Sequence, residues 1–217
     1  MFFKEFKVYK TEPLLRKTDY IVGSILAGLV VFISFLYFRL ELVAVIAPSV
    51  LFSFIIFSSI YFKRARLPSF NRLMPFYLTA LGVGLINFNE EFLTNFRVLF
   101  PQLYGGLPYS NNAFVTSNIV SYIIFLTAPL LVYFKGFGVF LMPLLFYVVY
   151  GVLGGSISHL LFGIYARGYF PGLYTSFLYW PLIQILLLIF LRSLKETVIF
   201  IFLALIIFVY SMSVLII

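Results

Sequence analysis

The sequence contains no cysteine and a single histidine, His159. Without cysteine the chain cannot form a disulfide, a thiolate metal site, an iron–sulfur cluster or a cysteine nucleophile. One imidazole is also too few, within one copy, for a haem held by two histidines or a zinc ion held by three. Any chemistry of this protein therefore depends on carboxylates, hydroxyls and this one ring.

Charged residues are scarce as well. They make up 10% of the chain, against about 25% in soluble domains. Asp19 is the only aspartate, and the sequence contains neither a GxSxG segment nor a phosphate-binding glycine loop. The usual serine triad and the P-loop therefore have no support.

Apolar residues, in contrast, are abundant. Hydrophobic residues account for 63% of the 217 positions and aromatic residues for 21%, and the mean hydropathy is +1.11. Because soluble domains are only about 45–50% apolar, this composition predicts an integral membrane protein with almost all of its mass in the bilayer.

The basic residues that produce the formal net charge of +8 separate hydrophobic segments instead of forming one basic face. This distribution is typical of membrane loops, so the expected partner is the lipid bilayer and not a nucleic acid. The first residues are polar and basic, and no small-residue cleavage motif follows the first apolar run. We therefore expect no cleavable signal peptide, but a basic cytoplasmic segment over 1–19 and one transmembrane domain over 20–217.

Hydrophobic runs bounded by charges predict about seven membrane-spanning helices. A spanning helix needs about 20 mostly apolar residues, and the third run is interrupted near its end by polar residues. No internal repeat or linker separates the runs. They cover approximately 20–38, 42–62, 73–89, 114–134, 137–166, 172–191 and 197–217.

The distribution of lysine and arginine predicts the orientation of these helices. With the N-terminus in the cytoplasm, twelve of the 15 basic residues lie in inner segments, and only Arg39, Arg97 and Arg167 lie outside. Such a bias is the positive-inside rule. The fold class expected is thus an all-α, multi-pass protein of the cell membrane, with the N-terminus cytoplasmic and the C-terminus outside.

The segment 92–113 is long for a loop between membrane helices. Phe92, Phe96 and Leu99 have helical spacing, so its first part either extends the third helix or lies in the interface as an amphipathic stretch. Prolines and glycines between 101 and 108 then require irregular backbone. We expect an outer loop here.

Glu90, Glu91 and His159 are the ionisable residues that cannot be explained as loop charges. Ionisable groups within a membrane are rare and usually face the bundle interior. Asn87, Glu90 and Glu91 share a helix face at i, i+3 and i+4, although the two glutamates diverge by about 100°. They either mark the end of the third helix or direct at least one carboxylate inward.

His159 lies in a stripe of small residues at four-residue spacing, formed by Gly151, Gly155 and Gly163. Such a stripe lets a neighbouring helix approach closely. One interpretation is that the imidazole only bonds across this helix interface. The other is that it pairs with a glutamate of the third helix beside a polar cavity, as a general acid and base.

Three further residues near the outer surface belong to the candidate site. Arg97 and Arg167 are basic residues that can pair with a glutamate at the membrane surface or hold a ligand, and Tyr169 has the character of an interfacial aromatic residue. Two carboxylates and one imidazole can form a facial iron set. Adjacent glutamates make that geometry awkward, so we predict no metal, and the sequence identifies no cofactor.

A spaced set of residues stands out between about 73 and 190: Asn87, Glu90, Glu91, Phe92, Asn118, His159, Gly163, Arg167, Tyr169, Pro171, Gly172, Thr175, Leu178 and Pro181. This pattern resembles that of the HXXEE family of small polytopic membrane proteins. That family is functionally uncharacterised, so the resemblance implies a membrane fold and a polar cluster that brings Glu90, Glu91, His159 and Arg167 together. Two positions depart from the family pattern, because Asn87 replaces its first histidine and Gly155 replaces an asparagine.

These observations leave three functions open. The first is binding or processing of an apolar small molecule such as a lipid, isoprenoid or quinone. A glutamate would then be the acid or base, His159 its partner, and Arg167 a headgroup or structural anchor. The second is a non-catalytic subunit of a larger membrane complex, and the third is a transporter. Whether the protein is an enzyme stays open.

Overall fold

The computed structural model describes residues 14–37, 40–214 and 216. Most of the basic segment predicted over 1–19 lies outside the described residues. So does Arg39, one of the three basic residues predicted to lie on the outer side. Within the described part every regular element is a helix and no strand is present, which confirms the all-helical prediction there. The elements are α1 (Lys17–Tyr37), α2 (Leu40–Phe62), α3 (Phe70–Leu93), α4 (Phe96–Gln102), α5 (Asn111–Lys135), η1 (Gly138–Phe140), α6 (Leu141–Phe146), η2 (Tyr147–Gly154), α7 (Gly155–Tyr165), α8 (Leu173–Ser176), α9 (Tyr179–Leu191) and α10 (Leu194–Ser213).

Six helical segments in the described chain are long and apolar enough to cross a membrane. The 24-residue α3 is not among them, because its second half carries Asn87, Asn89, Glu90 and Glu91. A multi-pass membrane protein is therefore supported, whereas the count of seven spans and the orientation stay predictions. The six segments are Lys17–Leu36, Leu42–Phe62, Asn111–Lys135, Gly138–Tyr165, Leu173–Leu191 and Leu194–Ser213.

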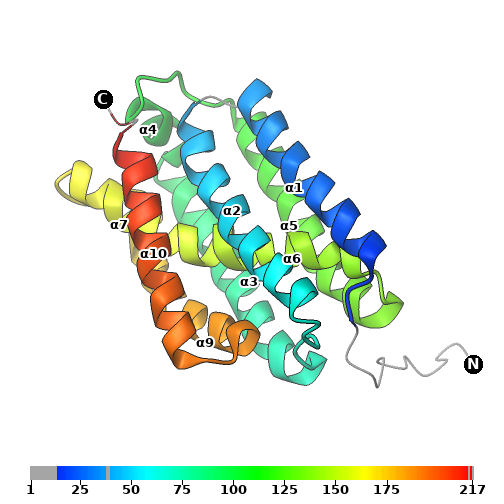
Figure 1. The fold of residues 1–217 in the computed structure, drawn as a ribbon. Helices are drawn as coiled ribbons and strands as arrows, with labels where there is room; N and C mark the ends of the chain where they lie inside the picture. Colours follow the sequence, from blue (N-terminus) through cyan, green and yellow to red (C-terminus); the bar gives the residue numbers. More distant parts are fainter. Residues whose placement is uncertain (1–13, 38–39, 215, 217) are drawn as a thin grey trace, which may run out of the picture.

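The continuous helix formed by η1, α6, η2 and α7 runs through the middle of the bundle. In Figure 1 it crosses obliquely behind α2 and α10. Its residues are apolar on all sides, as expected for a helix enclosed by others, and Leu144, Val148 and Leu153 are completely buried. The η2 part is a π-helix, a rare geometry that occurs most often near functional sites.

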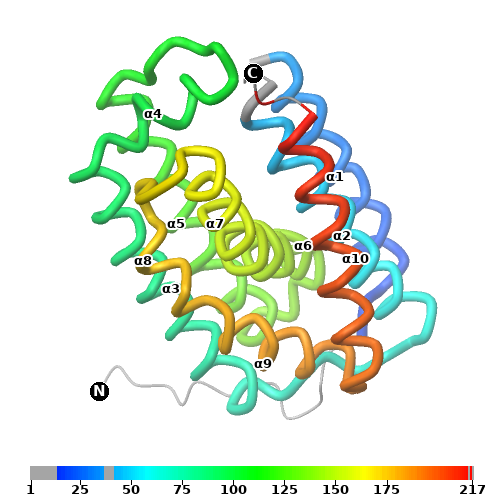
Figure 2. The backbone as a smooth tube through the Cα atoms, turned by 90° about the vertical axis from the view of Figure 1, so that its left-hand side faces the viewer, coloured from blue at the N-terminus to red at the C-terminus, as the bar shows by residue number. Residues whose placement is uncertain are grey.

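Helices α1, α2 and α10 lie on one side of this central helix, and α3, α4 and α5 lie on the other, as Figures 1 and 2 show. We call the end with η1 and the α2–α3 connection the inner end, and the end with α4 the outer end. At the inner end α1 and α5 both contact η1, where the Asp19 carboxylate approaches Gly138.

The segment predicted as one helix over 172–191 is broken in the structure. It forms the short α8 and then α9, with a turn at Phe177 and Leu178 between them. Pro181 explains the break, because a proline inside a helix removes a hydrogen bond and clashes with the preceding turn. Starting α9 at Tyr179 puts Pro181 in its first turn, where the missing N–H is not needed.

The long outer segment contains the amphipathic helix that its spacing allowed. Helix α3 ends at Leu93, Asn95 adopts a left-handed backbone conformation with φ 64°, and α4 follows. Phe96 and Phe100 of α4 stack with ring centroids 4.9 Å apart, and Phe100 is buried in the bundle. This short helix therefore covers the outer end of the interior.

Candidate functional site

The centre of the site is a contact between Glu91 of α3 and His159 of α7. Atom Nε2 of His159 lies 3.1 Å from Oε1 of Glu91, and the two side chains are only 5% and 13% exposed. Phe96 of α4 covers the imidazole with its centroid 5.6 Å away. Pairing with a glutamate of the third helix was one of the two interpretations that the sequence left open for His159, and the structure places Glu91 beside it.

The other imidazole nitrogen determines how many protons this pair can hold. Atom Nδ1 of His159 lies 2.8 Å from the carbonyl oxygen of Pro171. A carbonyl oxygen can only accept, so Nδ1 must carry a hydrogen. One further proton can then lie between Nε2 and Glu91, either on the ring beside a carboxylate or on the carboxyl group beside a neutral ring. The geometry thus defines a pair that can share a single proton across the Nε2–Oε1 contact.

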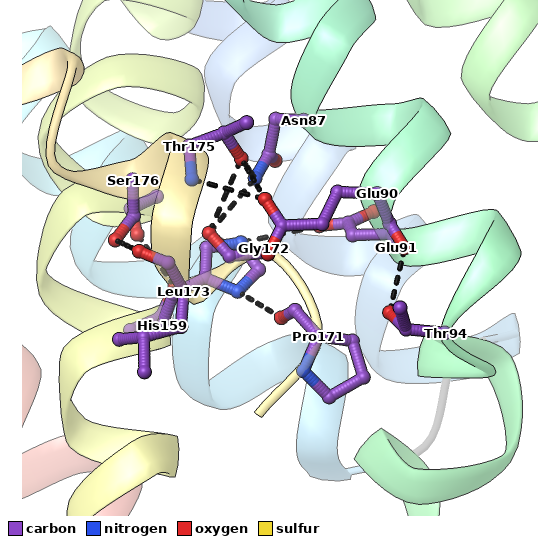
Figure 3. Close-up of polar contacts among 12 residues, drawn as sticks. Asn87, Glu90, Glu91, Thr94, His159, Pro171, Gly172, Leu173, Thr175 and Ser176 are labelled. Atoms are coloured by element: carbon purple, nitrogen blue, oxygen red, sulfur yellow. Dashed lines mark hydrogen bonds and ion pairs between the residues drawn. The ribbon is translucent and has the colours of Figure 1, made fainter. Parts of the chain in front are cut away.

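The Glu90 carboxylate binds the start of α8 instead of the imidazole (Figure 3). Its Oε1 accepts hydrogen bonds from the Tyr169 hydroxyl at 2.9 Å and the Tyr174 N–H at 3.2 Å. Its Oε2 accepts from the N–H and the hydroxyl of Thr175 at 2.9 and 2.7 Å. The first N–H groups of a helix need such acceptors, and the cap residue Gly172 has no side chain to supply one. Glu90 therefore caps α8 from a different helix.

Asn87 fastens the same loop one turn earlier on α3. Its buried amide nitrogen donates to the Gly172 carbonyl at 3.2 Å and to the Thr175 hydroxyl at 2.7 Å. Asn87 is thus a positioning residue for the loop that supplies the Pro171 carbonyl to His159.

Gly172 is required by the close packing of this loop. Its φ is +84°, which favours glycine. A Cβ atom at this position would overlap the imidazole of His159 and lie 2.9 Å from the Asn87 amide nitrogen. The absence of a side chain therefore lets the loop and the ring lie against each other.

The remaining predicted site residues lie at the edge of the cluster or outside it. Tyr169 belongs to it through Glu90, and burial together with the neighbouring carboxylate raises the pKa of its phenol, which therefore stays protonated and donates. Arg97 ties α4 to the next segment by donating to the Tyr109 carbonyl at 3.1 Å, and Arg167 is exposed in the turn after α7.

Neither arginine pairs with a glutamate within the described residues, where the ion pairs join Lys63 to Glu196 and His159 to Glu91. Nor does any group of three histidine, aspartate or glutamate side chains in these residues come close enough to hold a metal ion. The divergence of Glu90 and Glu91 explains the absence of such a group, since only one carboxylate faces the imidazole.

A cavity of about 690 Å³ lies beside the Glu91–His159 pair. Its wall combines both sides of the bundle, from the outer halves of α1 and α2 to α3, α5 and the π-helix. Most of the lining is aliphatic or aromatic, and among the described residues that form it there is no lysine or arginine. Its polar members are Ser34, Asn87, Glu91, Tyr109, Ser117, Asn118, Ser121, Tyr122, Tyr147, Tyr150, Ser158, His159 and Tyr179.

Tyr147 of the π-helix brings an unsatisfied hydroxyl to this cavity. Its side chain is 2% exposed, and its oxygen has no hydrogen-bond partner within the described part of the chain. The Tyr122 hydroxyl lies nearby, because both oxygens are within 3.2 Å of where a Cβ on Gly84 would be. Buried hydroxyls are normally bonded, so the Tyr147 hydroxyl is an exception in the described part of the chain.

Apart from Asn118 and Gly151, the sequence analysis missed the cavity residues on α5 and η2. A signal was present on α5, where Ser117 and Ser121, and likewise Asn118 and Tyr122, repeat at four-residue spacing inside an apolar run. That spacing places polar groups on one helix face. For Tyr147 no comparable signal exists, because tyrosine is common throughout this chain.

No family model matches the chain, and no curated protein or solved structure is similar to it. The resemblance to the HXXEE family therefore stays a prediction.

Proposed function

We propose that this chain is a multi-pass protein of the cell membrane that crosses it seven times, with α3 as the additional span. At 1.5 Å per residue its 24 residues extend over about 36 Å, longer than the hydrocarbon core of about 30 Å. Of the polar residues near its outer end, Asn87 and Glu91 line the cavity and Glu90 binds the start of α8, whereas the exposed Asn89 amide bonds within α3. The excess of basic residues in the inner segments supports a cytoplasmic N-terminus.

We further propose that the protein binds an apolar small molecule with a polar head, of the lipid, isoprenoid or quinone kind. The observation that carries this proposal is the cavity of about 690 Å³, whose apolar wall contains the Glu91–His159 pair and the Tyr147 hydroxyl. Ligand sites are typically apolar cavities of about 300–1,000 Å³ with a few polar groups that set orientation.

The charge of the cavity wall determines which polar head group the ligand can carry. Glu91 and His159 are already paired with each other, and no lysine or arginine among the described lining residues would balance a phosphate. An unpaired charge is costly to bury. The ligand that fits is therefore neutral and carries a hydroxyl or a carbonyl, as a prenol, a quinone or a diacylglycerol does.

The proposed chemistry is exchange of a proton between the ligand head and the Glu91–His159 pair. A ligand hydroxyl group beside Glu91 would give a proton to the pair, whereas a ligand carbonyl oxygen would take one from it, as in general acid–base catalysis. The Tyr147 hydroxyl, which lies next to Gly84 of α3, would form a hydrogen bond with the same head. Glu90 and Asn87 act as positioning residues, because they hold the loop that orients the imidazole.

The ligand would enter from the outer half of the bilayer. Val30 and Ile33 of α1 line the cavity, yet they are also 38% and 45% exposed on the outside of the bundle. Toward the inner end α1 and α5 are closed against η1. An apolar molecule can therefore reach the cavity sideways from the lipid without passing through water.

The test is equilibrium binding to the full chain in lipid nanodiscs, with farnesol and decylubiquinone as neutral probes and farnesyl diphosphate as the charged one. We expect a neutral probe to bind and the diphosphate to bind weakly. Tyr147→Phe should weaken neutral binding by about tenfold, since a hydrogen bond contributes about 0.5–1.5 kcal/mol. The matched control is Glu196→Gln, an acidic residue on α10 outside the cavity. Failure of both neutral probes, or equal binding by Tyr147→Phe, would contradict the proposal.

A further inference from the structure

A second cavity, of about 450 Å³, lies at the inner end of the bundle. It is formed where α3 begins and α9 ends, two helices that pack against each other. Its wall contains Pro68, Ser69, Arg72, Leu188, Ile189 and Arg192. No residue of this cavity belongs to the site described above, which lies toward the other end of α3.

Two positive charges face this cavity without a negative one. Arg72 and Arg192 both line it, and none of its described lining residues is acidic. The nearby ion pair of Lys63 with Glu196, 3.9 Å apart, uses a different cation. Like charges that share a small space repel each other. An anion bound between the two arginines would reduce this repulsion.

The two guanidinium groups differ in how they are held. Arg192 donates to the Arg66 carbonyl oxygen, which fixes its side chain across the α2–α3 connection. The Arg72 guanidinium has no hydrogen bond or ion pair to any other described residue, so all its donors are available. The Ser69 hydroxyl, which precedes α3, does not cap that helix and adds a further donor. Guanidinium donors suit phosphate oxygens particularly well.

We propose that this pocket binds a phosphate group, and that the phosphate belongs to an anionic lipid of the inner leaflet. The rest of the wall favours a lipid as the source, because Leu188 and Ile189 of α9 place apolar side chains beside the two arginines. Basic pockets between membrane helices on the cytoplasmic side are typical headgroup sites. The lipid would hold the α3 and α9 ends together.

Native mass spectrometry of the full chain, released from nanodiscs with equal phosphatidylglycerol and phosphatidylcholine, tests this proposal. We expect wild type to retain one phosphatidylglycerol in preference to phosphatidylcholine. Arg72→Gln and Arg192→Gln should each reduce that preference by about fivefold, since a basic residue near the surface contributes about 1 kcal/mol of attraction. Lys195→Gln is the matched control, an exposed inner cation that does not line the pocket.

Each outcome either supports or overturns the binding of an anionic lipid in this pocket. Loss with both arginine variants but not with Lys195→Gln supports the proposal, and competition by millimolar inorganic phosphate would show that the headgroup alone is recognised. Equal losses with all three variants would mean a general surface attraction and would overturn it, as would an unchanged preference in Arg72→Gln. Because Arg192 also supports the α2–α3 connection, Arg72→Gln alone is sufficient if the Arg192 variant does not fold.

Discussion

Glu90 and Glu91 are neighbours in sequence but have different surroundings. Consecutive residues of an α-helix point about 100° apart, so one carboxylate meets the start of α8 and the other meets His159. The first accepts four hydrogen bonds and has no free position for a ligand. The second faces the cavity. Substitution of Glu90 should therefore lower the stability of the protein, whereas substitution of Glu91 should weaken ligand binding.

Gly172→Ala should destabilise the protein. The new methyl group would overlap the His159 imidazole, and alanine is strained at φ +84°. We expect a loss of roughly 2–4 kcal/mol in the free energy of unfolding, from overpacking and backbone strain together, measured by thermal unfolding in detergent. Gly168→Ala is the control in the same turn, because no described atom lies within 4 Å of its Cβ position. Equal stability of the two variants would contradict the close packing of Gly172.

The proton on His159 can be observed directly, because the chain has one histidine. Nitrogen-15 NMR of histidine-labelled protein should show a hydrogen on Nδ1 under all conditions in which the protein is folded, since Nδ1 faces the Pro171 carbonyl. In Glu91→Gln we expect a neutral ring with Nδ1 protonated, because the amide can donate to Nε2. A ring with a bare Nδ1 in either protein would refute the assigned hydrogen-bond pattern.

At the scale of elements, Glu90 should determine the stability of α8. Glu90→Ala removes the acceptor for the N–H groups of Tyr174 and Thr175. Hydrogen exchange of these amides should accelerate by about tenfold, the effect of losing roughly 1.4 kcal/mol of local stability. Asn89→Ala is the control, since its exposed amide bonds only within α3. Unchanged exchange in Glu90→Ala would show that α8 does not depend on this cap.

The long helices could be predicted from sequence, whereas short breaks within them could not. Uninterrupted apolar runs determine that α2 and α5 form, so their bounds were anticipated within three residues. The break between α8 and α9 depends on Pro181 and on a cap from Glu90, a residue more than 80 positions away. Local patterns do not contain such contacts.

The candidate site, too, could be predicted from the sequence only where local patterns determine it. The pairing of His159 with a glutamate follows from the rarity of ionisable groups in a membrane. Which glutamate it contacts depends on the rotation of α3, and the capping role of Glu90 depends on the position of α8. Arg167 was expected near the cluster but lies in an exposed turn, because the chain reverses there with a positive φ of 52°.

At the scale of the whole molecule, the absence of cysteine makes the topology directly testable. If α3 spans the membrane, Lys63 at the end of α2 and Asn112 at the start of α5 lie on opposite sides. An impermeant thiol reagent applied to intact cells should label Asn112→Cys and spare Lys63→Cys, and it should label both after permeabilisation. Labelling of both residues in intact cells would show that α3 does not cross.

The position of the Glu91–His159 pair has a consequence for where its protons come from. The pair lies toward the outer end of α3, while η1 closes the inner ends of α1 and α5. With the proposed orientation, the pair would equilibrate with the extracellular medium and be shielded from the cytoplasmic buffer.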